Sequence, residues 1–272
     1  MAEKLRRCAV WLLAGLAAAH GQSASSAFKD PRLEEAVHKF VAVDPGKSAA
    51  EVPLDRVILV NGSGIQDLSG LENCPNLVTL FLAESDIADL TPLSKLTKLQ
   101  QLTITGGKLR DLSALSALTN LEYLDLSNNQ ISDLKPLAGL KNLQTLNLSN
   151  NRIEDLTPLS GLTRLKLLHL DANQISDIKP LGALKSLWLL SLKNNRVKDI
   201  SPLTTLTDWS YLYLDQNQIS DISPLVTMVH AQPDAQKITR MWTISLKGNP
   251  LSADAKTKQL PELTKSAFDV ID

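Results

Sequence analysis

Leucine and isoleucine positions recur every 22 residues through most of this 272-residue chain. The repeating unit reads Leu-x-x-Leu-x-Leu-x-x-Asn-x-Ile-x-Asp-Leu-x-Pro-Leu-x-x-Leu, and positions are numbered from its first leucine. Position 1 is occupied in turn by Leu77, Leu99, Leu121, Leu143, Leu165, Leu187 and Trp209. The Leu-x-Leu segment alternates with period two, which predicts a short strand with one buried face. Because one such repeat cannot bury its leucines alone, the pattern predicts an α/β solenoid of stacked repeats with a parallel sheet.

The repeats divide the chain into segments. A weaker first copy at 55–76 and a partial ninth copy bound a repeat domain at 55–251, with eight repeats of 22 residues and an insertion at about 229–240. Helical caps are expected at 28–54 and 252–272, because the terminal leucines would otherwise face water. The apolar residues that we assign to the inward positions of the first copy are Ile58, Val60, Ile65, Leu68 and Leu71.

Asparagine occupies position 9 of the later repeats, at the point where the chain turns inward. The residues are Asn129, Asn151, Asn173, Asn195, Asn217 and Asn249. A side-chain amide can donate to and accept from the unpaired backbone groups of such a turn, so stacked copies predict a hydrogen-bonded ladder rather than a ligand site. The first three repeats carry Ser63, Ser85 and Gly107 at this position. We therefore predict a looser N-terminal third.

Aspartate stands at position 13 of every repeat, at Asp67, Asp89, Asp111, Asp133, Asp155, Asp177, Asp199 and Asp221. Such a column of carboxylates raises the hypothesis of a calcium site. A cation needs several oxygens around one point, however, and carboxylates one repeat apart do not supply them. Each aspartate also precedes a Leu/Ile-x-Pro-Leu segment or a close variant, so we predict that it caps a short 3₁₀ turn.

The first 21 residues have the three parts of a signal peptide. Lys4, Arg6 and Arg7 precede an apolar run too short to cross a bilayer, and Ala19-His20-Gly21 offers a cleavage site. A fortuitously apolar, disordered N-terminus is the alternative. Elsewhere no apolar run reaches membrane-spanning length, so we expect no membrane span.

Charge and cysteine content narrow the partners further. The formal net charge is −1, without the basic excess that nucleic-acid binding requires, and we expect no nucleic-acid partner. Cys8 lies within the predicted signal peptide, which leaves Cys74 without an intrachain partner. Cys74 aligns with leucines of later repeats, which favours a buried hydrophobe over a reactive thiol.

No arrangement of residues in the sequence indicates catalysis. The chain lacks a nucleophile motif, a glycine-rich phosphate loop and a His/Cys metal-ligand spacing. His169 and Asp171 share a strand face, but one such pair is not a catalytic constellation. We therefore expect no enzyme activity, no cofactor and no catalytic or metal site.

Positions 3, 5 and 7 of each strand are predicted to face solvent on the sheet. Several of these positions in the later repeats are apolar or aromatic, which has no explanation in the core. With Trp188 at their edge they give a candidate partner-binding surface of Tyr123, Leu167, His169, Trp188, Leu189, Tyr211 and Tyr213. Asp171, Lys193 and Asp215 would form its polar rim. Scattered apolar residues that pack on one another across strands are the alternative interpretation.

The chain resembles the 22-residue class of leucine-rich repeats, which includes bacterial internalins and a regulatory subunit of a protein phosphatase. The 20 residues from Leu121 to Leu140 carry the repeat pattern, and the segment from Phe28 to Lys39 is similar to an internalin N-terminal cap. The resemblance implies a horseshoe with a concave parallel sheet, a convex side of 3₁₀ or irregular turns, and helical caps. It also implies protein recognition on the concave sheet. The sequence has no immunoglobulin-like domain after the C-terminal cap and no cell-wall sorting motif, so host-cell adhesion is not carried over.

These observations predict an exported, non-catalytic module that binds a protein partner, located outside the cell or in the periplasm, and monomeric. An intracellular regulator or scaffold of an enzyme such as a phosphatase is the alternative if the N-terminus is not a signal peptide. A glycan-binding protein and a purely structural spacer are further alternatives.

Overall fold

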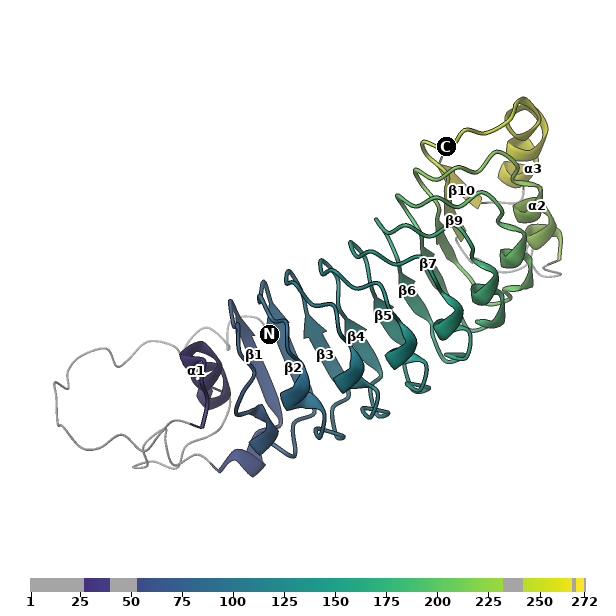
Figure 1. The fold of residues 1–272 in the computed structure, drawn as a ribbon. Coiled ribbons are helices and arrows are strands. Elements are labelled where there is room, and N and C mark those ends of the chain that lie inside the picture. Colours follow the sequence, from purple (N-terminus) through teal and green to yellow (C-terminus); the bar gives the residue numbers. More distant parts are fainter. Residues whose placement is uncertain (1–26, 40–52, 232–241, 266–267, 272) are drawn as a thin grey trace, which may run out of the picture.

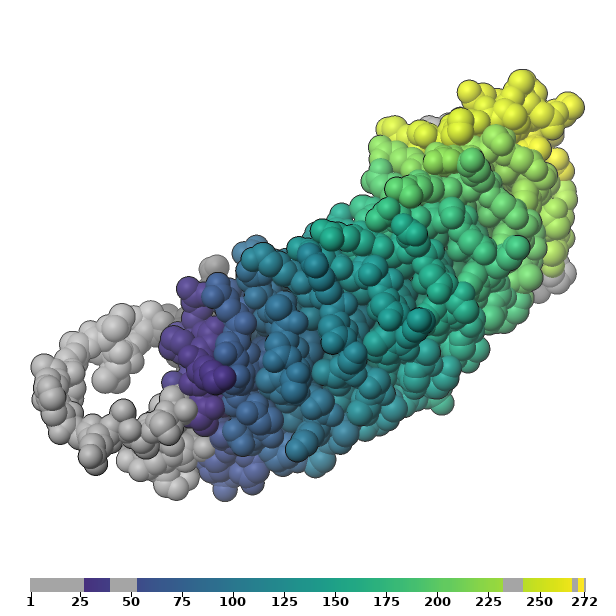
Figure 2. All heavy atoms as spheres, viewed as in Figure 1, coloured from purple at the N-terminus to yellow at the C-terminus, as the bar shows by residue number. Residues whose placement is uncertain are grey.

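The computed structural model describes residues 27–39, 53–231, 242–265 and 268–271. They form one solenoid, in which strands follow one another along one side and short turns or helices line the other (Figure 1). The space-filling view shows the repeats stacked in sequence order along the length of the molecule (Figure 2). The predicted signal peptide, residues 40–52 of the N-terminal cap and most of the insertion lie outside the described residues.

Ten parallel strands form a single sheet whose spatial order follows the sequence. They are β1 Leu59–Ser63, β2 Thr79–Ala83, β3 Gln101–Ile104, β4 Tyr123–Asp125, β5 Thr145–Asn147, β6 Leu167–His169, β7 Leu189–Ser191, β8 Tyr211–Tyr213, β9 Trp242–Ser245 and β10 Phe268–Ile271. From β2 to β8 each residue pairs with the residue 22 positions later, as Leu124 does with Leu146. The sequence period is therefore the sheet register, and the predicted leucine-rich-repeat fold is confirmed.

The opposite side of the sheet is covered by 3₁₀ turns. They span Leu54–Arg56, Leu71–Asn73, Thr91–Leu93, Ser113–Leu115, Lys135–Leu137, Thr157–Leu159, Lys179–Ala183 and Ser201–Thr205. Between the two sides lies one continuous core of leucine and isoleucine side chains, most of them fully buried. Cys74 belongs to this core, and burial together with nearby Glu72 raises the pKa of its thiol to about 11. The thiol is therefore protonated at neutral pH and acts as a small apolar side chain.

The first repeat differs from the prediction, because it is two residues shorter than the others. Val60 pairs with Leu80, an offset of 20 residues, and Ile58 is 62% exposed instead of inward. Val60 takes the inward position assigned to Ile58, and Val57 is buried at position 1. Gly62 accommodates the shortening: it stands where later repeats have an inward leucine, and a Cβ on it would lie 2.6 Å from Ile65 Cδ1. Ile65 thus fills the space that a leucine side chain occupies elsewhere.

The predicted asparagine ladder is present from Asn129 onward. Asn151 Nδ2 donates to the carbonyls of Leu126 and Leu148, each at 3.0 Å. Its Oδ1 accepts the Ile131 N–H of the preceding repeat at 3.0 Å. Asn129, Asn173, Asn195, Asn217 and Asn249 repeat this pattern with local variations in distance. The amides therefore satisfy buried backbone groups and link each repeat to the one before it.

The position-13 aspartates hold the start of each convex turn. Asp89 Oδ1 accepts the Thr91 N–H at 2.8 Å, and all eight aspartates accept the N–H two residues later. Hydrogen bonds from the side chain and the backbone of Thr157 lower the pKa of Asp155, and those from Ser201 lower the pKa of Asp199. The carboxylates are thus engaged in local turns, as the capping interpretation predicts.

The two ends of the solenoid are closed differently. At the N-terminus, α1 (Pro31–Lys39) places buried Leu33, Ala36 and Val37 against the first repeat. In the eighth repeat, a helix, α2 (Ser223–His230), replaces the 3₁₀ turn. A π-helical turn (Ala255–Gln259) and α3 (Leu260–Lys265) follow.

The C-terminal segment at 252–272 contains the expected helical residues and also a strand that the sequence did not predict. Its last described residues form β10, which pairs in parallel with β9 and extends the sheet by one strand. Val270 packs against the core from this strand. Asp269 and Ile271, on either side of Val270 along the strand, are exposed. None of the described helices is long and apolar enough to cross a membrane.

Candidate functional site

The apolar residues predicted to face solvent lie side by side on adjacent strands. Leu167 of β6 pairs with Leu189 of β7, and Leu189 pairs with Tyr211 of β8. All three are half-buried, although they lie on the face of the sheet opposite the core. Sheet geometry brings their side chains within contact range, because paired residues on one face are close neighbours.

Aromatic rings continue this row toward both edges of the strands. The Trp188 ring meets the Tyr211 ring edge to face, with centroids 4.9 Å apart at 76°. Tyr211 and Tyr213 are nearly parallel, at 6.3 Å and 21°. Lys193 Nζ lies 4.4 Å from the centroid of the Tyr213 ring. We call Trp188, Leu189, Tyr211 and Tyr213 the Trp188 cluster, with Leu167 beside it.

Trp188 differs from the other described tryptophans in its exposure. Trp188 is 45% exposed, whereas Trp209 and Trp242 stack on each other inside the core and are 2% and 6% exposed. Proteins rarely leave so much indole surface in water without a use for it, and tryptophan is enriched among residues that anchor partners. Trp188 is therefore the most distinctive residue of this face.

Two of the predicted site residues lie apart from the cluster. Tyr123 of β4 is separated from Leu167 by Thr145 of β5. Burial, with a contribution from Asp125, raises the pKa of its phenol. His169 is separated from Tyr213 by Ser191, which is 2% exposed. The 22-residue spacing of the sequence places the small residues Thr145 and Ser191 between these two residues and the cluster.

The rim aspartates form hydrogen bonds with serines of the following repeat, a feature that the sequence analysis missed. Ser191 Oγ donates to Asp171 Oδ1 at 2.5 Å, and the Lys193 N–H donates to the same oxygen at 2.8 Å. Ser245 Oγ donates to Asp215 Oδ1 in the same way on the next pair of repeats. A sequence pattern could have indicated these bonds: Ser-Leu-Lys recurs at 191–193 and 245–247, each time one repeat after an aspartate at position 7. These bonds fix the rim carboxylates against the sheet.

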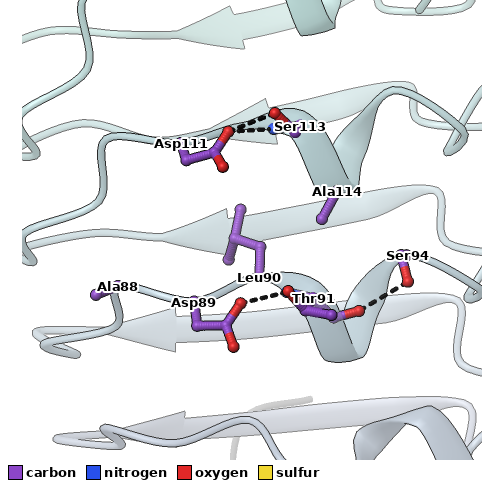
Figure 3. A pocket seen from close by; sticks show the side chains of 8 residues that line it. All are labelled: Ala88, Asp89, Leu90, Thr91, Ser94, Asp111, Ser113 and Ala114. Atoms are coloured by element: carbon purple, nitrogen blue, oxygen red, sulfur yellow. Dashed lines mark hydrogen bonds between the residues drawn. The ribbon is translucent and has the colours of Figure 1, made fainter.

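A hollow of about 210 Å³ lies on the convex side, between the second and third repeats (Figure 3). Asp89 and Asp111 line it, but their carboxylates point to the turn residues Thr91 and Ser113 (Figure 3). Those hydrogen bonds lower the pKa of both carboxyl groups. Among the described residues, no three His, Cys, Asp or Glu side chains come together as a metal site would require. Ala114, which stands where most other repeats have proline, is one of the residues that line the hollow.

The fold and its repeated motif define a leucine-rich-repeat protein. A family model described as leucine-rich repeats (two copies) matches residues 119–161, 141–183 and 185–227. Internalin C2 of Listeria monocytogenes is 38% identical over 73% of this chain and 89% of its own, with a TM-score of 0.69. An internalin (InlF) of the same organism is 31% identical over 90% of this chain and 76% of its own, with a TM-score of 0.75. The chain therefore belongs to the internalin-like leucine-rich-repeat proteins.

A more distant likeness shows the fold alone. The plant peptide hormone receptor RGFR1, solved in complex with RGF2, is 20% identical over 70% of this chain and 32% of its own, with a TM-score of 0.57. No curated protein sequence matches the chain.

Proposed function

We propose that the protein is a non-catalytic recognition module that binds a protein partner on the C-terminal half of its concave sheet. The observation that carries this proposal is the Trp188 cluster: contiguous apolar and aromatic side chains at solvent-facing strand positions. Family membership supports it, because leucine-rich-repeat proteins of this kind act through protein interactions. The plant receptor of the same fold, solved with a hormone, is consistent with that role.

The geometry of the cluster suits binding energetically. Its rings already contact one another and Lys193, so few rotamers remain to be lost when a partner arrives. Aromatic residues buried at the centre of an interface commonly contribute about 2 kcal/mol or more each. The hydrogen-bonded rim of Asp171 and Ser191 adds a fixed polar border. A pre-organised apolar centre with a polar rim is the usual anatomy of a protein interface.

Export is part of the proposal, and the tripartite pattern of residues 1–21 supports it. N-terminal sequencing of protein from the source cells tests it. A mature chain that starts at Gln22 or Phe28 supports export, whereas an intact Met1 in a cytosolic fraction contradicts it and favours an intracellular regulator. Light scattering of the purified chain tests the proposed monomeric state, and a concentration-independent mass of one chain is expected.

Affinity capture with matched variants tests the binding proposal. The mature chain is used to capture proteins from secreted and envelope fractions, beside a Leu167→Ser, Leu189→Ser, Tyr211→Ser variant. A Thr79→Ser, Gln101→Ser, Thr145→Ser variant changes the same column on the N-terminal half and serves as the control. Circular dichroism verifies that both variants are folded. We expect one partner to be retained by the wild type and the control and lost by the first variant; equal retention by all three would contradict the proposed site.

A further inference from the structure

The two halves of the concave face differ in charge. At positions 2 to 8 of the repeats that contain β1 to β5, the charged residues are Glu84, Glu122 and Asp125. From β6 to β10 the same positions carry Lys166, Lys193 and Lys247 together with Asp171, Asp215 and Asp269. The face thus changes from acidic to neutral where the Trp188 cluster begins, and Lys166 and Lys193 lie on either side of that cluster.

Asp171 and Asp215 are hydrogen-bonded within the sheet, whereas the lysines of this half form no ion pair. Each of the two aspartates accepts a serine hydroxyl from the next strand. Among the residues that the structure describes, the ion pairs are Lys108–Asp86, His230–Glu262 and Lys258–Asp254, so the concave lysines contact no carboxylate. The Lys166 Nζ reaches only the Gln144 side chain, at 3.3 Å, and the Lys193 Nζ rests over Tyr213. Both ammonium groups can therefore donate hydrogen bonds to a carboxylate of a bound partner.

The spacing of these lysines sets the length of the ligand. Lys166 directly precedes β6 and lies beside Trp188, whose N–H donates to the Lys166 carbonyl at 2.8 Å, and Lys193 lies five residues beyond Trp188 along the β7 segment. At a rise of about 3.3 Å per residue, the two lysines bracket the cluster over about 16 Å. About five residues of extended polypeptide span that distance.

We infer that the Trp188 cluster binds a short acidic segment of a partner protein, in which carboxylates flank one aromatic or aliphatic side chain. The inference rests on the proposed function and specifies its ligand. The apolar side chain packs against Trp188, Leu189 and Tyr211, while the carboxylates pair with Lys166 and Lys193. The acidic N-terminal half of the sheet repels the segment, which confines it to β6–β9 and adds selectivity through electrostatic complementarity.

Synthetic peptides test the charge requirement. The probes are three fluorescein-labelled nine-residue peptides with the same central phenylalanine, flanked on each side by glutamates, serines or lysines. Fluorescence anisotropy with the full chain measures affinity at 50 and 500 mM salt. We expect the glutamate peptide to bind about tenfold more tightly than the serine peptide at low salt and the lysine peptide to bind most weakly, with the difference shrinking at high salt. Equal affinities, or no binding of the glutamate peptide at millimolar concentration, would overturn the inference.

Lysine variants locate the effect. The Lys166→Ser, Lys193→Ser variant should lose the preference for glutamate, whereas a Lys135→Ser, Lys179→Ser variant, altered on the convex side, should keep it. Quenching of Trp188 fluorescence gives a second readout without any peptide, isolated as the difference between wild type and Trp188→Phe. Iodide should quench Trp188 more efficiently than caesium, and the concave lysine variant should reduce that excess. Preferential quenching by caesium would overturn the assigned potential. If affinity capture by the cluster persists while the peptides bind equally, the proposed function stands and the acidic ligand does not.

Discussion

The N-terminal repeats and the repeats from Asn129 onward have the same fold but stabilise their turns differently. From Asn129 onward, a buried asparagine side chain accepts a backbone N–H from the turn of the preceding repeat. The strands that follow, as far as β8, are three residues long. Before it, Ile87 N–H donates instead to Ser85 O within its own turn, at 2.8 Å. Strands β1 to β3 are longer, at five, five and four residues. Backbone hydrogen bonds between repeats continue into the turn in both halves, as from Ser85 N–H to Thr105 O and from Asn150 N–H to Asp171 O, so the asparagine bonds are the main difference between the halves.

The same division separates the surfaces of the two halves. The concave face of the early repeats is polar and acidic, whereas that of the later repeats carries the aromatic cluster and three lysines. A regular amide ladder holds the later strands in fixed register, and a fixed register is what places Leu167, Leu189 and Tyr211 in one row. The proposed binding surface therefore lies on the part of the frame with the most uniform hydrogen bonding.

The largest expected effect comes from removing one amide of the ladder. Asn151→Ala leaves the Ile131 N–H and two carbonyls without their partner in a buried turn. We expect a loss of about 3 kcal/mol in the free energy of unfolding, because buried polar groups without partners are costly. Ser85→Ala removes a single bond, from Ser85 Oγ to Ala83 O, and should cost about 1 kcal/mol. Urea unfolding measures both, and equal losses would show that the ladder has no special role.

Extending the ladder into the third repeat should destabilise the protein. A Cβ on Gly107 would lie 2.6 Å from Ser85 O, a backbone atom that cannot move without the turn. Gly107→Asn is therefore expected to cost about 2 kcal/mol despite matching the consensus. The same urea experiment measures it, with Gly139→Asn, at an open convex position, as the control. A stabilised Gly107→Asn variant would contradict the account of the N-terminal turns.

The aspartate caps should contribute in both halves of the molecule and should make stability depend on acid. Because hydrogen bonds from Thr157 lower the pKa of Asp155 in the folded protein, its contribution is present above the ordinary value of 3.8 and is lost as pH falls through the lowered pKa. Asp155→Ala should lower Tm by about 2–3 °C at pH 6 and flatten its fall in acid. Thermal melts from pH 6 to pH 2.5 measure this. Glu154→Ala, at the exposed neighbouring residue, is the control, and an identical acid profile for both variants would exclude a capping role.

The smallest expected effect is a gain in stability at one turn. Position 8 is left-handed in successive repeats, and the residue there is glycine or asparagine in several of them. Ala172 adopts φ of 53°, which costs a residue with a Cβ roughly 1 kcal/mol. Ala172→Gly should therefore raise stability by about 0.5 kcal/mol, after the entropy of the unfolded glycine is subtracted. Differential scanning calorimetry of this variant and of Asn194→Gly, the control, measures the gain in stability. A loss of stability in Ala172→Gly but not in Asn194→Gly would show that Ala172 is not strained.

Most of the fold was predictable from the sequence because one rule repeats. The 22-residue period gives the sheet register, the asparagines at position 9 give the ladder, and the aspartates at position 13 give the turn caps. The predictions failed at the two ends of the chain, where the 22-residue period is broken. In the first copy, the match of Ile58 to position 4 concealed a two-residue deletion, which the 20-residue register offset between β1 and β2 reveals. At the C-terminus, β10 has no repeat around it to indicate that the sheet continues.

The candidate site was predictable as a row but not as a cluster. Alternation along a strand shows which residues share a face, so Leu167, Leu189 and Tyr211 could be aligned from their spacing alone. Ring geometry depends on rotamers, and the packing of Trp188 on Tyr211 follows only from coordinates. The separation of Tyr123 and His169 from the cluster also follows from spacing, because Thr145 and Ser191 occupy the intervening strand positions. The serine–aspartate hydrogen bonds of the rim were not predicted, because they link residues that are 20 or 30 positions apart in the sequence.

Photo-crosslinking from single positions tests most directly the claim that the partner binds the later repeats. A benzoylphenylalanine replaces Leu189 in one variant and Gln101, at the same strand position on the early repeats, in another. The captured partner is then irradiated with each variant under identical conditions. The account predicts a covalent adduct from position 189 and none from position 101. An adduct from position 101 alone would place the binding surface on the other half of the sheet and contradict the role given to the Trp188 cluster.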